Sequence, residues 1–316
     1  YYVNISLGNG ARMSTAIEPT GDADVIYKSF HNYKFVEADT YNIAKMGRRW
    51  FGHRFYVENV RAFSFDFPNL ITSNPVDLKV YTAAVSESDS SMQLNLNGSN
   101  ISNFTYPAID TNVLARSRFF SGAVSSSSET INIELSYNNS GNPSATAYLD
   151  YISIEAECAL TSLGNQFEFK HKSTSTQSGI GQFEISNAAS ISQVWDISNP
   201  YQIQVYNNTD AQSEFRFKTN LGALKTYQAV GSDFYVPRKT NNTNIPNQDI
   251  KGTVFLDAQG SFKDVDYLIV APNYLRAQAE RLAQINRTQY NLNVKVYTLE
   301  SIYQEFSSGM QDIGGI

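Results

Sequence analysis

The chain has 316 residues, of which 41% are hydrophobic and only 17% charged, and its formal net charge is −6. No long basic run exists, which argues against nucleic acid as a partner, and no apolar run approaches the roughly 20 residues that a membrane-spanning helix needs. The 20 Tyr and 19 Phe, among abundant Ser, Thr and Asn, are typical of β-rich extracellular modules.

Residues 1–162 predict a jelly-roll-like β-sandwich. Apolar and polar residues alternate in short runs at residues 2–7, 63–67, 78–83, 131–135 and 149–154. This period of two places one face of each strand on a core and the other in water. Asn97-Gly98 predicts a tight hairpin turn, and residues 39–49 are the one stretch of this part expected to be helical.

Residues 163–262 predict a second β-sandwich-like module of a common size. Its alternating runs are residues 167–169, 181–185, 202–206 and 214–217. The polar residues 241–247, which include a proline, are interpreted as a connector.

Residues 263–316 predict the opening of a parallel α/β sheet. A strand at 266–271, a helix at 275–290, a strand at 294–299 and a helix at 300–306 follow one another, and Gly309 ends the last helix. Because such a sheet needs more strands and helices on both faces, we expect the chain to be cut here, as well as at Tyr1. A neighbouring molecule is expected to cover the apolar side chains of Leu275, Leu282, Val294, Val296 and Ile302.

Cys158 is the one cysteine and therefore the first candidate nucleophile. As a thiol nucleophile it would need a base among His31, His53 and His171, and we favour the other interpretation, a small buried hydrophobic residue. One cysteine can form neither an intrachain disulfide nor a structural zinc site, and the histidines lack metal-ligand spacing. The sequence also lacks a Gly-x-Ser-x-Gly elbow and a His-Glu-x-x-His motif.

Carboxylates and glycines offer weaker candidates. Glu155 and Glu157 share a strand face and could bind calcium or act as acid and base, but a solvated face is the favoured interpretation. A second group of carboxylates lacks EF-hand spacing: Asp257, Asp264 and Asp266. Gly179-Ile180-Gly181 lacks the third glycine of a dinucleotide site. The residues thus predict no cofactor, no metal and no catalytic site.

The stretch from His31 to Phe55 is the densest in aromatic and charged residues. It could form an aromatic platform for a sugar or a peptide. We favour a long loop that wraps the sandwich, with Arg48 or Arg49 paired to Glu37 or Asp39. Two aromatic residues are predicted to lie in the core: Trp50 and Trp195.

Several motifs resemble those of a known family. Residues 266–272 resemble the first strand of the gingipain-like (C25) cysteine peptidase domain, and residues 293–309, which include Ile302-Tyr303-Gln304-Glu305-Phe306-Ser307-Ser308-Gly309, resemble its second strand and helix. Asn247-Gln248 fits the entry segment of that domain. Upstream, residues 37–42, 47–55 and 194–200 resemble signatures of type IX secretion sortases, with His53 in place of the usual Glu.

The resemblance implies a cell-surface cysteine endopeptidase of Bacteroidetes, located on the extracellular face of the outer membrane. Such an enzyme would remove C-terminal sorting domains from cargo proteins and attach the cargo to anionic lipopolysaccharide. An outer-membrane shuttle β-barrel would be its partner, and the catalytic Cys/His dyad would lie beyond Ile316, so that the present chain would be inactive alone. Two alternatives stay open, namely the accessory domains of another secreted gingipain-like peptidase and a carbohydrate-binding module of a surface protein.

Overall fold

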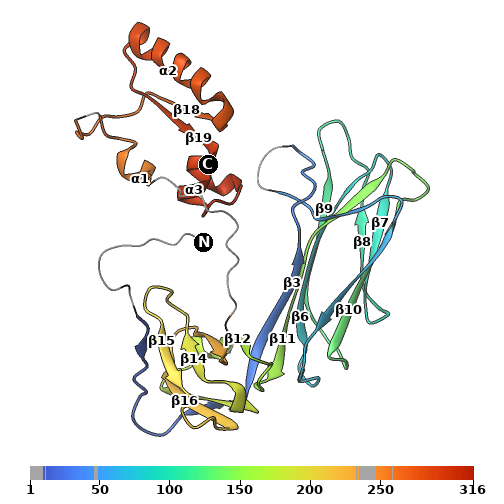
Figure 1. The fold of residues 1–316 in the computed structure, drawn as a ribbon. Coiled ribbons are helices and arrows are strands. Elements are labelled where there is room, and N and C mark those ends of the chain that lie inside the picture. Colours follow the sequence, from blue (N-terminus) through green and yellow to red (C-terminus); the bar gives the residue numbers. More distant parts are fainter. Residues whose placement is uncertain (1–9, 11, 46–48, 233, 235–246, 258) are drawn as a thin grey trace. The chain divides into compact units, whose positions relative to one another are not determined.

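The computed structural model describes residues 10, 12–45, 49–232, 234, 247–257 and 259–316. Contacts divide the chain into two compact units, Gly10–Val236 and a unit that contains Pro237–Ile316 (Figure 1). The division therefore lies near residue 236, whereas the sequence placed the end of the second β-module at residue 262. The sequence runs at 2–7 and 241–246 lie outside the described residues.

The strands between Ser29 and Ala159 form the first sandwich. Its two antiparallel sheets have the strand orders β5-β10-β7-β8 and β3-β11-β6-β9. The strands are β3 (Ser29–Glu37), β4 (His53–Phe55), β5 (Val60–Asp66), β6 (Val76–Val85), β7 (Ser90–Leu96), β8 (Ser99–Tyr106), β9 (Arg116–Val124), β10 (Thr130–Asn138) and β11 (Thr146–Ala159). The short β4 pairs with β11. The prediction of a mostly β fold with sandwich-like modules is confirmed.

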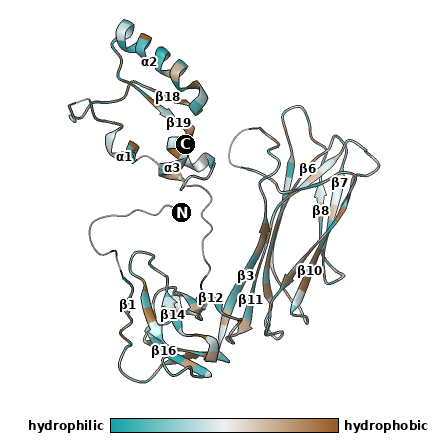
Figure 2. Cartoon of the chain, viewed as in Figure 1, coloured by the Kyte–Doolittle hydropathy of each residue, from teal (hydrophilic) through white to brown (hydrophobic). Residues whose placement is uncertain are grey.

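Alternation builds the core of this sandwich. Along β6, Val76, Leu78 and Val80 are fully buried, while Asp77 and Lys79 between them are exposed. Teal and brown segments alternate along the strands for this reason (Figure 2). The predicted hairpin turn is confirmed, because Asn97 and Gly98 have φ angles of 47° and 81°, as a type I′ turn requires.

The second sandwich has the strand orders β1-β15-β14-β17-β12 and β16-β13-β2. Its strands are β1 (Ser14–Thr15), β2 (Val25–Tyr27), β12 (Gln166–Lys170), β13 (Ile180–Ser186), β14 (Gln193–Asp196), β15 (Gln204–Asn207), β16 (Glu214–Asn220) and β17 (Thr226–Val230). Strands β1 and β2 pair in parallel with β15 and β13, so these early residues join the second sandwich, although the sequence grouped them with the first. Such long-range pairing leaves no local signal in the sequence.

The predicted helix at 39–49 is wrong for the residues that the structure describes. Tyr41 and Phe51 exchange two backbone hydrogen bonds of 2.8 Å and form an isolated antiparallel bridge. Lys45 adopts a positive φ of 54°, which a helix excludes. Pairing between the two arms of this segment thus outweighs the weak apolar pattern that suggested a helix.

The predicted elements of the α/β unit are confirmed. They are β18 (Tyr267–Ala271), α2 (Arg276–Tyr290), β19 (Val294–Thr298) and α3 (Leu299–Phe306), and β18 pairs with β19 in parallel. The short helix α1 (Ile250–Thr253) was not predicted. Val294 and Ile302 are buried within the unit, whereas Leu275 and Leu282 are 42% and 45% exposed. Part of the apolar surface is therefore covered by the unit itself. No helix among the described residues is long and apolar enough to cross a membrane.

Candidate functional site

The outer face of the β3-β11-β6-β9 sheet carries a group of aromatic, charged and hydroxyl side chains. The strand register aligns these side chains in three consecutive rungs, each with one residue from every strand. In the order β3, β11, β6, β9 the rungs hold Glu37, Tyr151, Tyr81 and Phe119; then Phe35, Ser153, Lys79 and Ser121; then Tyr33, Glu155, Asp77 and Ala123. Residues far apart in the sequence thus form one surface.

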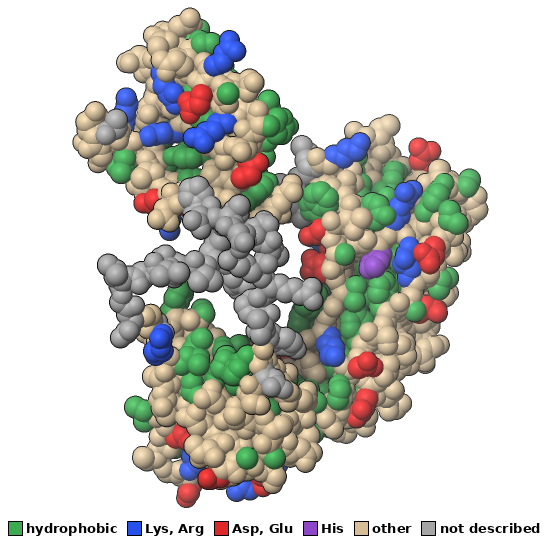
Figure 3. Space-filling model, in the orientation of Figure 1, with side chains coloured by type: hydrophobic (Ala, Val, Ile, Leu, Met, Phe, Trp, Pro, Cys, Tyr) green, Lys and Arg blue, Asp and Glu red, His purple; other side chains and the backbone are tan. Residues whose placement is uncertain are grey.

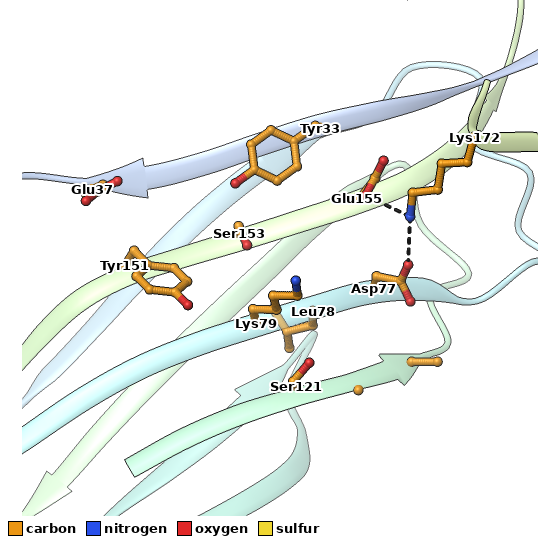
Figure 4. A pocket seen from close by; sticks show the side chains of 12 residues that line it. Tyr33, Glu37, Asp77, Leu78, Lys79, Ser121, Tyr151, Ser153, Glu155 and Lys172 are labelled. Carbon is orange, nitrogen blue, oxygen red and sulfur yellow. Dashed lines mark hydrogen bonds and ion pairs between the residues drawn. The ribbon is translucent and has the colours of Figure 1, made fainter. Parts of the chain in front are cut away.

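A groove of about 530 Å³ runs over this face. Tyr33 and Tyr151 contribute aromatic rings to its lining, and Ser153, Lys79 and Ser121 contribute polar groups (Figure 4). Small-molecule sites commonly occupy about 300–1,000 Å³ and combine aromatic walls with a few polar groups. The volume of the groove falls within this range, and charged and polar side chains make up much of its lining.

Lys172 closes one end of the groove. It belongs to a short 3-10 helix, η1 (Lys172–Ser175), that follows β12 of the second sandwich. Its Nζ lies 2.8 Å from a carboxylate oxygen of Glu155 and 3.1 Å from one of Asp77 (Figure 4). Burial alone would lower the pKa of Lys172, but the two carboxylates raise it. The ammonium group therefore stays charged and ties the groove to the second sandwich.

An aromatic row borders the other end of the groove. Tyr81 lies between Tyr151 and Phe119, with ring centroids 6.3 Å and 6.2 Å away. The Arg49 guanidinium lies 4.4 Å from the Tyr81 ring centroid and pairs with Asp150, which occupies a register shift of β11. The expected pairing of Arg49 with Glu37 or Asp39 is therefore wrong. The bulge turns Asp150 toward Arg49, and Arg48 lies outside the described residues.

Two histidines meet where the first sandwich contacts η1. The His31 and His171 rings are 4.7 Å apart and edge to face, and His171 Nε2 lies 3.7 Å from Glu157 Oε1. Burial lowers the pKa of His31, and burial followed by the neighbouring His31 lowers the pKa of His171. Burial would raise the pKa of Glu157, but hydrogen bonds from Ser29 and Asn74 lower it. The contact thus holds neutral imidazoles beside an ionised carboxylate.

Cys158 faces the core of the first sandwich and is fully buried. Burial raises the pKa of its thiol to about 11, which opposes thiolate formation. The adjacent residue Glu157 pairs in register with His31, but alternation along the strand sends these two side chains to the opposite face. The structure therefore does not bring Cys158 and His31 together as a nucleophile and a base.

The remaining sequence candidates have local structural partners. The Asp257 carboxylate accepts hydrogen bonds from the backbone N–H groups of Gln259 and Ser261, and Asp266 accepts one from Asn293. Gly179 has a φ of 93° and its Cα lies against Asp24, whose carboxylate accepts from Ile180 N–H. Among the described residues no group of His, Cys, Asp and Glu is arranged to hold a metal ion.

The aromatic stretch from His31 to Phe55 is only partly brought together. Its first part is strand β3, so the expected wrapping loop is wrong there, and Tyr33 and Phe35 are 49% and 59% exposed. Trp50 is 36% exposed and Trp195 is half-buried, stacked on Phe234, so neither is the core residue that was expected.

Sequence reasoning missed the contribution of three residues from later strands: Tyr81, Phe119 and Tyr151. The available signal was an aromatic side chain at a position that the strand alternation assigns to solvent.

In the α/β unit the carboxyl ends of β18 and β19 lie side by side. Thr298 caps α3 through a 3.2 Å hydrogen bond from Ser301 N–H, and Glu300 accepts from Asn273 N–H at the start of the segment after β18. The Glu305 carboxylate accepts from the N–H groups of Ile250 and Lys251. In open α/β sheets ligands bind at this end of the strands.

Comparison with known proteins shows which family and which solved structures this chain resembles. Residues 261–316 match the model of the family described as Peptidase family C25. Of the curated proteins, none matches the chain. The structure of dimeric latent PorU from Porphyromonas gingivalis superposes with a TM-score of 0.70 at 20% identity and covers 96% of this chain but 29% of its own. This chain thus spans less than a third of the length of that relative.

Other solved structures resemble smaller parts of the chain. A CBM36-1 domain of a xylanase from the hindgut metagenome of Trinervitermes trinervoides has 16% identity, covers 39% of this chain and 96% of its own, and gives a TM-score of 0.27. A carbohydrate-binding module CBM36 in complex with calcium and xylotriose has 17% identity, covers 40% of this chain and 99% of its own, and gives 0.25.

The resemblance predicted from the sequence motifs is confirmed by the family match and by the superposition on PorU. Residues 261–316 match the C25 peptidase family, and the chain has the fold of a PorU-type, gingipain-like fragment.

Proposed function

We propose that this chain is part of a type IX secretion sortase, in which the two sandwiches are accessory modules of a gingipain-like cysteine peptidase. The complete enzyme removes C-terminal sorting domains from cargo proteins and attaches the cargo to anionic lipopolysaccharide. The observation that carries the proposal is the superposition on PorU over 96% of the chain, together with the C25 match of residues 261–316.

The proposed chemistry places the nucleophilic Cys and its base His outside residues 1–316, at the carboxyl end of the parallel sheet that β18 and β19 begin. The burial of Cys158 and its raised pKa support this assignment, because a nucleophilic thiol needs access and a thiolate. The sandwiches then present cargo, or partners such as an outer-membrane shuttle β-barrel, on the extracellular side of the outer membrane.

The test uses the full-length protein, a cargo protein with its C-terminal sorting domain, and anionic lipopolysaccharide as the acceptor. Mass spectrometry of the released cargo separates two outcomes, a free new carboxyl end from hydrolysis or an end that carries the acceptor. Transfer supports the sortase, while hydrolysis alone favours another secreted gingipain-like peptidase. No cleavage, or cleavage that iodoacetamide does not inhibit, contradicts the proposal.

Cys158→Ala is the matched control. The variant is expected to retain activity and to remain sensitive to iodoacetamide, because the alkylated thiol lies elsewhere. Loss of activity in a folded Cys158→Ala variant would show that the nucleophile lies within the present chain.

A further inference from the structure

We infer that the groove on the β3-β11-β6-β9 sheet is a binding site for a neutral glycan chain. This site is independent of peptidase activity, because every residue that lines it belongs to the two sandwiches. Four observations carry the inference: exposed aromatic rings, a polar floor, the balance of charge and central strands that are paired on both sides.

The aromatic rings supply the first observation. Tyr33 and Phe35 project from β3 with ring centroids 5.9 Å apart, and Phe119 at the other edge of the sheet is 50% exposed. Tyr81 and Tyr151 lie between them in the same surface. An aromatic face is a flat apolar surface, and a tyrosine adds a hydroxyl group at its rim. A pyranose ring presents a matching C–H face, so rings of this kind can stack on it.

The floor of the groove supplies the second observation. Ser153 and Ser121 offer hydroxyl groups that both donate and accept, Lys79 donates, and the carboxylates of Glu155 and Glu37 accept. A row of sugar hydroxyl groups needs donors and acceptors of this mixed kind. An apolar peptide side chain would leave these polar groups without partners, which is costly when water is excluded.

The third observation is the balance of charge. Two lysines and three carboxylates line the groove, and Lys172 pairs with two of those carboxylates, Glu155 and Asp77. The other two charged groups, Lys79 and Glu37, are of opposite sign. Neither a strongly anionic nor a strongly cationic chain would meet a large surplus of opposite charge in this groove. The charges therefore complement a neutral ligand.

The fourth observation excludes strand addition to the face. Strands β11 and β6 are paired on both sides, so their backbone groups are already used within the sheet. A peptide that binds by β-augmentation needs a free strand edge. Recognition on this face must come from side chains, as it does for a sugar chain.

Several residues have distinct roles in this site. Tyr151 and Tyr33 stack against sugar rings, Ser153 and Lys79 bind hydroxyl groups, and Lys172 fixes the end of the groove. Because Lys172 comes from the segment after β12, correct packing of η1 on the first sandwich is needed to complete the site.

The test is binding of the 316-residue chain to an array of neutral oligosaccharides, which includes cellohexaose, xylohexaose and mannohexaose, beside hexagalacturonate as the anionic probe. Titration calorimetry then measures the best neutral ligand. Tyr151→Ala and Tyr33→Ala are expected to weaken binding at least about tenfold, as the loss of a central aromatic contact does. Tyr151→Phe keeps the ring and is expected to keep most of the affinity.

Asn103→Ala, on the opposite sheet, is the matched control and is expected to leave binding unchanged. Circular dichroism and the urea midpoint verify that the Tyr→Ala variants are folded. Three results would overturn the inference: no binding to any neutral oligosaccharide, tighter binding of hexagalacturonate than of every neutral probe, or full affinity in folded Tyr33→Ala and Tyr151→Ala. Sedimentation that shows a dimer dissolved by Tyr151→Ala would overturn it as well, by assigning the face to a second copy.

Discussion

The two outer faces of the first sandwich differ, although both belong to antiparallel sheets that cover the same core. The rungs of the β5-β10-β7-β8 face carry short polar side chains such as Asn103, Gln93 and Ser136. There Asn100 donates to Asn95, and Asn95 donates to Glu134, so the amides satisfy one another. Figure 3 shows that hydrophobic and charged side chains also reach the surface of the sandwiches.

The β3-β11-β6-β9 face presents five aromatic rings over the same extent of sheet: Tyr33, Phe35, Tyr81, Phe119 and Tyr151. Solubility and folding favour the polar pattern, so exposed aromatic rings that gather on one face indicate binding. The two faces therefore share the alternation of their strands but differ in the chemistry of the side chains that they present to solvent.

The largest loss of stability is expected from the side of the β3-β11-β6-β9 sheet that faces the core. Ile152 is fully buried, and Ile152→Ala should lower the free energy of unfolding by about 2–5 kcal/mol through lost burial and a cavity. The neighbouring Tyr151→Ala should cost only about 0.5–1.5 kcal/mol, the worth of an aromatic pair. Urea titration measures both. Equal losses would mean that Tyr151 is a core residue and not part of a binding face.

The second largest effect on stability is expected at Glu157, a residue of β11 that accepts hydrogen bonds from Ser29 and Asn74. Glu157→Ala removes the acceptor of the Ser29 hydroxyl and of the Asn74 amide, which lies 2.6 Å away. An expected loss of about 1–3 kcal/mol follows from leaving polar groups unpaired. A double-mutant cycle with Ser29→Ala checks this, and strict additivity would show that the two residues do not interact in solution.

The third prediction is a pH dependence of stability. The folded pKa values of His31 and His171 are lowered from 6.5 by burial, so the unfolded chain binds more protons as the pH falls below about 6.5. Stability is therefore expected to decline from there down to the lowered folded pKa values. Glu157 affects stability at a lower pH. Its stabilising effect is fully present above pH 4.5 and is lost as the pH falls through its lowered folded pKa.

Urea titrations between pH 7.5 and pH 5 measure this decline over roughly the range in which histidine titrates. His31→Gln should flatten the decline, because the variant removes one titrating group and the repulsion that it exerts on a protonated His171. The charged and titratable groups that face His31 are His171, Glu157, Lys172, Glu155 and Asp77, and the variant changes none of them. An unchanged slope would show that the histidines titrate as they do in the unfolded chain.

The smallest effect is expected on the polar face. Asn103 is exposed, and Asn103→Ala should change the free energy of unfolding by no more than about 0.5 kcal/mol. The variant should also bind the best neutral oligosaccharide as the unmodified chain does. A large loss of stability would mean that the amide network of this face stabilises the fold. The two faces would then differ less in what their side chains contribute.

Local sequence patterns predicted many of the secondary-structure elements and the mostly β fold class. Alternation with a period of two predicted several strands of each sandwich, Asn97-Gly98 predicted the turn, and the β-α-β-α pattern after residue 262 predicted the α/β unit. These features are local, because strand alternation, turn conformation and helix capping depend on residues within a few positions of one another. The family motifs in residues 266–309 are equally local and were recognised for that reason.

The sets of distant residues that share a surface could not be predicted from local patterns, because long-range strand pairing brings them together. The pairing of β1 and β2 with the second sandwich, the bulge that directs Asp150 to Arg49, and the register that aligns Tyr33, Tyr81 and Tyr151 all depend on strands far apart in the chain. The exposure of Trp50 and the absence of a helix at 39–45 have the same origin. A shift of one residue in register would send every side chain to the other face, so the groove exists only because pairing across the whole sheet fixes that register.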